Sequence, residues 1–188
     1  MISKYAALQA IAVYMLSITA FAADTAKVID GVAYTQPQRM VEVERGRRLN
    51  LYCVGTGAPT VVFESGLGVT LSNWGFVQPE IAKNTRTCSY DRAGLGFSDP
   101  ASRASNSENI TDDLHRLLIS AAIQPPYVLV GHSYGGLTAR LYAYTYPAEV
   151  VGMVLVDPTT EDQVEAYRAL DIKKRTAAQW DEIGRAHV

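Results

Sequence analysis

The sequence predicts an α/β fold with a mostly parallel, doubly wound sheet. Three short apolar runs carry this prediction, at residues 60–64, 127–131 and 150–157. They lack the polar–apolar alternation of a half-exposed strand, so we expect each to be buried on both faces, as parallel strands are. Segments with helical spacing separate the later runs, and strands that alternate with helices are typical of a parallel sheet.

Turn signals and apolar runs predict the first elements. Val41 and Val43 alternate with charged residues, the polar run 44–48 can turn, and 49–54 resumes the pattern, which indicates a hairpin. The run 60–64 is a strand, and glycines end it. A short helix and a further strand are expected at 74–82 and 85–91.

The second half alternates helices with strands. Four apolar residues at helical spacing predict a helix over 107–123, with Ser107 as its N-cap and acidic residues in its first turns. Prolines end this helix, and a buried strand follows at 127–131. Residues 135–147 form a predicted helix that a proline stops, and 150–157 is expected to be the next buried strand.

Residues 1–22 are predicted to be an export signal. Lys4 gives a basic start, 5–21 is mostly apolar, and 20–22 has the small-x-small pattern of a cleavage site. A retained membrane anchor is the alternative, but this run is short for a bilayer span, and no later segment is apolar for long enough. We therefore expect an exported protein, periplasmic or secreted, with a polar leader at 23–40.

Charge and cysteine content restrict the possible partners. The net charge of −2 provides no basic field, so we expect no nucleic-acid partner. Cys53 and Cys88 are distant and have no nearby histidine, so they make a poor metal site. In an oxidising compartment they either form a disulfide or remain two buried thiols.

Ser133 is the candidate catalytic nucleophile, in a G-x-S-x-G pattern that runs from Gly131 to Gly135. The pattern stands between a predicted strand and a predicted helix, where a tight turn holds the serine hydroxyl exposed. Gly131 and Gly135 remove side chains that would collide in that turn, and the following helix N-terminus favours negative charge there. An ordinary glycine-rich turn is the alternative. A serine hydroxyl also needs a base to take its proton.

Two backbone N–H groups are candidate donors to a developing oxyanion. One is that of Tyr134, directly after the serine. The other is that of Leu67, in the glycine-containing loop 64–68 after a buried strand, although a plain turn is the alternative there. The loop 91–99 has neither glycine pattern of a phosphate-binding loop, so its glycines are expected to shape a loop near the mouth of the site.

The chain resembles the α/β-hydrolase fold family, on its serine esterase and lipase side. The matching segments occur in the family's order within about 41–162, at 59–68, 89–100, 127–136 and 150–158. The resemblance implies that Ser133 is the nucleophile, that Leu67 and Tyr134 supply the oxyanion donors, and that no cofactor is needed. It also implies a small-molecule acyl substrate. Many relatives have a histidine where this chain has Ser65, but a backbone donor is unaffected by that difference.

The base of the implied Ser-His-acid triad is not evident. The resemblance implies the order serine, acid, histidine, with the base after the last strand. His132 adjoins the serine on a strand, so its side chain should point to the other face and pack there. We expect His115 at the surface of its helix. Asp157 occupies the position of the acid in some relatives, but we favour a cap for the turn before Pro158.

His187 lies near the C-terminus but has no strand before it. Residues 183–188 also equal the translation of a common sequencing adapter, so we interpret them as an artefact. On this interpretation 163–182 begins a lid or linker region, and the chain is a fragment that lacks the family's last two strands and the catalytic histidine. Such a fragment is expected to be inactive.

Several reactions remain open on this fold. A secreted serine hydrolase of carboxylic esters is the first, and an acyltransferase, a perhydrolase, a C–C bond hydrolase and a non-catalytic ligand-binding member are alternatives. Epoxide and haloalkane hydrolysis are disfavoured, because those relatives use aspartate where this chain has Ser133. In the family's sheet the second strand lies beside the fourth, which would bring Cys53 and Cys88 within bridging distance and implies a disulfide.

Overall fold

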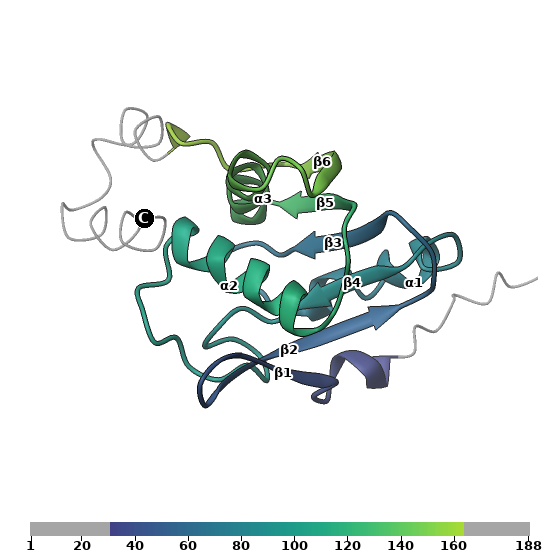
Figure 1. Cartoon of the computed structure of the whole chain (residues 1–188), viewed down its shortest axis with the longest axis horizontal. Helices are drawn as coiled ribbons and strands as arrows, with labels where there is room; N and C mark the ends of the chain where they lie inside the picture. Colours follow the sequence, from purple (N-terminus) through teal and green to yellow (C-terminus); the bar gives the residue numbers. More distant parts are fainter. Residues whose placement is uncertain (1–30, 164–188) are drawn as a thin grey trace, which may run out of the picture.

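The structure, a computed structural model, describes residues 31–163 and contains one six-stranded sheet in the order β1-β2-β4-β3-β5-β6 (Figure 1). The strands β4, β3, β5 and β6 run parallel, and the β1–β2 hairpin joins them antiparallel through β2. This confirms the predicted mostly parallel α/β sheet. The strands are β1 (Arg39–Glu44), β2 (Arg47–Val54), β3 (Thr60–Glu64), β4 (Thr87–Tyr90), β5 (Tyr127–His132) and β6 (Val150–Val156).

Helical elements cover both faces of this sheet. They are η1 (Gly31–Tyr34), η2 (Leu71–Trp74), α1 (Gln78–Ile81), α2 (Ser107–Ser120) and α3 (Tyr134–Thr145). The larger core lies under α2 and α3, where Val62 and Leu129 pack in one cluster with Leu117. Neighbouring strand residues point the other way, and on that second face Phe63 packs against Trp74, with ring centroids 4.7 Å apart.

Two local predictions need correction. Asn106, not Ser107, caps α2, because its side chain accepts a hydrogen bond from the Asn109 N–H at 2.9 Å. The helix predicted over 74–82 is split into η2 and α1, and α1 begins with Pro79 in its first turn, where the missing proline N–H costs no helical hydrogen bond.

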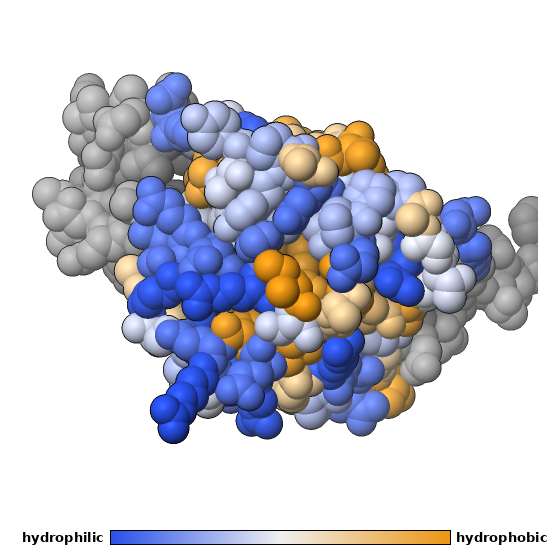
Figure 2. Space-filling model, viewed as in Figure 1, coloured by the Kyte–Doolittle hydropathy of each residue, from blue (hydrophilic) through white to orange (hydrophobic). Residues whose placement is uncertain are grey.

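The strand β6 is not the buried strand that its apolar sequence predicts. Val151 is 63% exposed and Val154 is 51% exposed. Among the described residues β6 pairs only with β5, so it forms an edge of the sheet, and apolar surface appears where it runs in Figure 2. A run of apolar residues predicts the strand but does not show whether a neighbour among the described residues covers it.

The β2–β4 pairing places Cys53 directly opposite Cys88, and the structure joins them by a disulfide. Between residues 31 and 163 no helix has the length and apolar character needed to cross a membrane. The predicted export signal at 1–22, residues 23–30 of the leader, and the segments 164–182 and 183–188 lie outside the described residues.

Candidate active site

Ser133 alone connects β5 to α3. Its backbone has φ of 53° and ψ of −123°, a conformation that residues with a side chain rarely adopt and that is typical of functional sites. Three backbone hydrogen bonds hold it: the Ser133 N–H donates to Val156 O at 3.1 Å, and the N–H groups of Gly136 and Thr159 each donate to Ser133 O at 2.9 Å. The serine is half-buried, and no described residue hydrogen-bonds its Oγ.

The glycines on either side of the serine have no room for a side chain. A Cβ added at Gly131 would lie 2.7 Å from Gly136 Cα, and one at Gly135 would lie 2.6 Å from Ser65 O. Both distances are too short for real Cβ contacts. The first turn of α3 therefore packs directly on the chain that leaves β3.

This packing brings the loop after β3 beside the serine. A Cβ added at Gly66 would lie 3.5 Å from Ser133 Cβ. Leu67, the next residue, has an N–H for which no acceptor is found within residues 31–163. The Tyr134 N–H belongs to the first turn of α3, which begins directly after Ser133. Both candidate oxyanion donors thus belong to segments that meet at Ser133.

A buried cluster of charged residues contacts the loop after β3. Glu64, the last residue of β3, is 0% exposed, and its Oε1 accepts a hydrogen bond from the Tyr90 hydroxyl at 2.6 Å. Arg92 Nε lies 3.8 Å from Glu64 Oε2. Burial raises the pKa of the Glu64 carboxyl above its usual value, although the Arg92 charge opposes this shift. Burial likewise raises the pKa of Tyr90 well above its usual value.

Sequence reasoning missed Glu64 and Arg92. Arg92 is buried and donates through Nη2 to the carbonyl oxygens of Ser65 and Gly66. A signal was available, because Glu64 ends one predicted strand and Arg92 follows the next one along the chain. Opposite charges at the carboxyl ends of strands that lie side by side can pair, and buried charges are rarely found unpaired.

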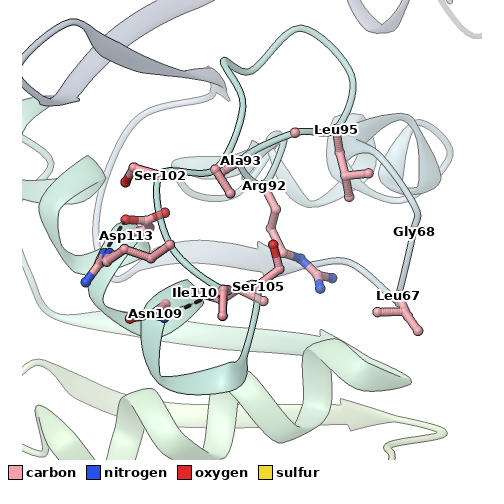
Figure 3. A pocket seen from close by; sticks show the side chains of 14 residues that line it. Leu67, Gly68, Arg92, Ala93, Leu95, Ser102, Ser105, Asn109, Ile110 and Asp113 are labelled. Carbon is pink, nitrogen blue, oxygen red and sulfur yellow. Dashed lines mark hydrogen bonds and ion pairs between the residues drawn. The ribbon is translucent and has the colours of Figure 1, made fainter. Parts of the chain in front are cut away.

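A cavity of about 340 Å³ opens beside this loop. Leu67 and Arg92 lie at one end and Asp113 at the other (Figure 3), where Arg47 binds both Asp113 oxygens at 2.6 and 2.8 Å. The remaining lining is mostly small or apolar: Gly68, Ala93, Gly94, Leu95, Ala101, Ser102, Arg103, Ala104, Ser105, Asn109 and Ile110. The glycine-rich loop after β4 therefore lines this cavity, whereas Ser133 is not among its lining residues.

Neither histidine of the described region hydrogen-bonds to Ser133. His132 packs edge-on to Trp74, with ring centroids 6.5 Å apart, and its Nδ1 has no partner in this part of the chain. His115, predicted at the surface of its helix, is half-buried there. It stacks on Tyr146 with centroids 3.8 Å apart, and its Nε2 lies 3.1 Å from Glu149 Oε1. His187 lies outside the described residues.

Asp157 follows β6 directly and has a left-handed backbone, with φ of 43°. Its side chain is exposed and makes no hydrogen bond with a described residue, so the predicted turn cap is not formed. Because the Ser133 N–H binds Val156 O, Asp157 stands at the same end of the sheet as the serine. No group of three histidine, cysteine or acidic residues within 31–163 could hold a metal ion.

Comparisons with known proteins agree with this architecture. A family model described as alpha/beta hydrolase fold matches residues 59–183. The chain is 34% identical over 128 residues, 64% of its length, to a 2-hydroxymuconate semialdehyde hydrolase of Pseudomonas sp. strain CF600. A meta-cleavage product hydrolase from Pseudomonas fluorescens IP01 superposes with a TM-score of 0.57 at 27% identity over 65% of the chain. A bromoperoxidase from Bacillus anthracis does so with a TM-score of 0.58, at 24% identity over 73%.

These matches cover 45%, 45% and 55% of the three known proteins respectively. The chain therefore spans about half the length of the relatives it matches. At 24% identity the similarity to the bromoperoxidase shows the fold alone.

Proposed function

Because the chain belongs to the α/β-hydrolase fold family, we propose that it acts as a serine hydrolase on a carboxylic ester or a related acyl compound. One observation carries the proposal. The strained turn at Ser133 and the loop after β3 meet so closely that a Cβ at Gly66 would be 3.5 Å from Ser133 Cβ. A nucleophile and a backbone donor on segments that meet this closely can act on the same carbonyl group.

The proposed reaction has two steps. Ser133 Oγ attacks the acyl carbon as a base takes its proton, and the N–H groups of Leu67 and Tyr134 hold the oxyanion that forms. The C–O bond to the alcohol then breaks, the alcohol leaves with that proton, and water hydrolyses the acyl-serine. The base in this proposal is a histidine outside the described residues.

The cavity beside Leu67 is the proposed site for the apolar part of the substrate. The charged side chains that line it are already paired, since Arg103 binds Asp113 and Arg92 binds the loop carbonyls. An uncharged group therefore fits it better than an ionised one, because burying an unpaired charge is costly.

Labelling with a fluorophosphonate tests the proposal. Such a reagent phosphonylates only a serine that is activated as a nucleophile. In the full-length protein we expect mass spectrometry to find the label on the peptide that contains Ser133, and to find none in Ser133→Ala. An unlabelled but folded wild-type protein would instead support a non-catalytic ligand-binding role.

A second candidate is a C–C bond hydrolase that uses the same serine. The similarity to proteins named 2-hydroxymuconate semialdehyde hydrolase and meta-cleavage product hydrolase favours it. Parallel assays with 2-hydroxymuconate semialdehyde and with p-nitrophenyl esters separate the two candidates. Adding an alcohol to the ester assay tests for acyl transfer, because a transferase would form the new ester rather than the free acid.

We further propose that the protein is exported, with residues 1–22 as the signal. The signal-like sequence supports this, and so does the Cys53–Cys88 disulfide, since disulfides persist in oxidising compartments. The intact mass of the protein recovered outside the cytoplasm tests it. A mature form that begins at Ala23 is expected, and recovery of the unprocessed chain from the cytoplasm alone would overturn export.

A further inference from the structure

Arg92 contacts three consecutive residues at the end of β3. Its Nη2 donates to Ser65 O and to Gly66 O, the latter at 2.7 Å, and its Nε lies 3.8 Å from Glu64 Oε2. The residue is only 6% exposed. Both hydrogen bonds come from Nη2, while Nε makes none among the described residues, so this one nitrogen holds the path of the chain between β3 and Leu67.

The contact with Gly66 bears directly on the proposed oxyanion donor. The Gly66 carbonyl and the Leu67 N–H belong to the same planar peptide group. A cation that binds the carbonyl oxygen draws electron density from the amide nitrogen, so the N–H of that group becomes a stronger donor. Arg92 is therefore placed to strengthen the hydrogen bond from Leu67 to an oxyanion without touching the substrate's carbonyl.

The same guanidinium also touches the second donor's residue. Arg92 Cζ lies 5.3 Å from the centroid of the Tyr134 ring, within the range of a cation–π contact. The Tyr134 side chain is fully buried, and its hydroxyl hydrogen-bonds with Ser107 Oγ at 2.9 Å. One side chain thus connects the loop of Leu67 with the helix start of Tyr134.

We propose that Arg92 is the positioning residue of the oxyanion hole: it holds the two donor segments together and polarises the Leu67 peptide. This inference rests on the proposed serine hydrolase function. Buried ion pairs are often no more stabilising than apolar side chains of the same size, so stability alone does not account for a buried charge on these two carbonyls. Because the oxyanion exists only in the transition state and intermediates, loss of Arg92 should lower kcat more than it raises KM.

The test compares two lysine substitutions in the full-length protein. Arg92→Lys keeps the charge, but its shorter side chain does not reach the position of Nη2 between the two carbonyls. It should lower kcat for a p-nitrophenyl ester by roughly 10- to 100-fold, less than the loss of a whole oxyanion donor. KM should stay within about threefold. Affinity for a trifluoromethyl ketone, which forms a tetrahedral adduct on the serine, should fall by the same factor as kcat/KM.

Arg47→Lys is the matched control. Arg47 is also 6% exposed and binds a buried carboxylate through two nitrogens, but it touches neither donor segment. The Arg47→Lys variant should lose about as much unfolding free energy as Arg92→Lys does, while its kcat stays within about threefold of wild type. An equal fall of kcat in both variants would show that Arg92 acts only as part of a structural ion pair, and it would overturn the inference.

A double variant covers the case in which Arg92→Lys does not fold. Arg92→Met with Glu64→Gln removes both charges of the buried pair together, which is tolerated better than leaving one charge alone. The same selective loss of kcat and of ketone affinity is expected. Unchanged kcat in this folded variant would overturn the inference. Fluorophosphonate labelling of wild-type Ser133 distinguishes that outcome from failure of the proposed function, since the label is then still found.

Discussion

Gly66 and Ser133 lie side by side at one end of the sheet, although they belong to different βα units. The reason is strand register. The parallel strands β3 and β5 pair Glu64 with Gly131, so the residues two positions further along each strand leave the sheet together. A Cβ added at Gly66 would be 3.5 Å from Ser133 Cβ. The candidate nucleophile and donor loop are thus aligned by the sheet itself.

The first prediction concerns the nucleophile. Ser133→Ala should lower kcat for a short p-nitrophenyl ester by on the order of 10⁴- to 10⁶-fold, the usual result of removing such a serine. The circular dichroism spectrum should be unchanged. Ser120→Ala, at the exposed end of α2, is the control and should match wild type. If Ser133→Ala keeps activity within about tenfold of wild type, Ser133 is not the nucleophile.

The second prediction concerns the space around the serine turn. Gly135→Ala places a Cβ 2.6 Å from Ser65 O, so α3 and the loop must move apart. We expect the free energy of unfolding to fall by about 1–3 kcal/mol, measured by urea denaturation, and esterase activity to fall with it. In Gly152→Ala the new Cβ meets Val128 at an ordinary 3.5 Å, so its stability should stay within about 1 kcal/mol of wild type. Equal stability of the two variants would contradict the packing described.

The third prediction concerns the cysteines. Alkylation without reductant should modify neither Cys53 nor Cys88 in protein made in an oxidising compartment. Because 35 residues separate them, replacing both by serine should cost about 4 kcal/mol of unfolding free energy on the loop-closure estimate. Two alkylated thiols in the unreduced protein would show that the disulfide is absent.

The fourth prediction concerns the cavity. Ser105→Phe adds a ring in an exposed loop that lines it, and should lower kcat/KM for p-nitrophenyl octanoate by about tenfold or more while the acetate is little affected. Ser120→Phe adds the same ring away from the cavity and should change neither rate. A uniform loss on both esters in Ser105→Phe would place the acyl chain elsewhere.

The fifth prediction concerns pH. Burial raises the pKa of Glu64 above 4.5 in the folded protein, so the folded state binds this proton more tightly than the unfolded state does. The resulting stability is complete below about pH 4.5 and is lost as pH rises through the raised pKa, by at most about 1.4 kcal/mol per pH unit. The unfolding free energy of wild type minus that of Glu64→Gln should therefore fall with rising pH. Glu42→Gln, at an exposed glutamate, is the control, and a difference that rises with pH would reverse the assigned shift.

Much of the fold follows from local sequence, and the exceptions share one cause. The order of strands and helices could be predicted because apolar runs and turn residues act locally. Burial of β6 could not, since it depends on what lies beside the strand, and the packing of His115 depends on Tyr146 and Glu149, which lie between α3 and β6. The roles of Ser133 and Leu67 as nucleophile and donor stay predictions that the experiments above test.

The support for Arg92 was missed for the same reason. Its acceptors Ser65 and Gly66 are backbone carbonyls on another strand's loop, and a carbonyl has no signature in the sequence. The N-cap of α2 differs by one residue because Asn106 and Ser107 are both good caps. Only the geometry of the chain that enters the helix selects Asn106.

Through the two hydrogen bonds that hold Ser133 to Val156 and Thr159, the time that Ser133 spends in its unusual conformation depends on β6. Within residues 31–163 these bonds tie the strained serine turn to the edge strand β6 and to the loop that follows it, and edge elements belong to the part of a domain that opens most readily. Each opening of the β5–β6 ladder would release the turn from its unusual backbone angles. Ser133 then keeps its reactive backbone conformation only for as long as β5 and β6 stay paired. A mutation on β6 that never approaches substrate can shorten that time.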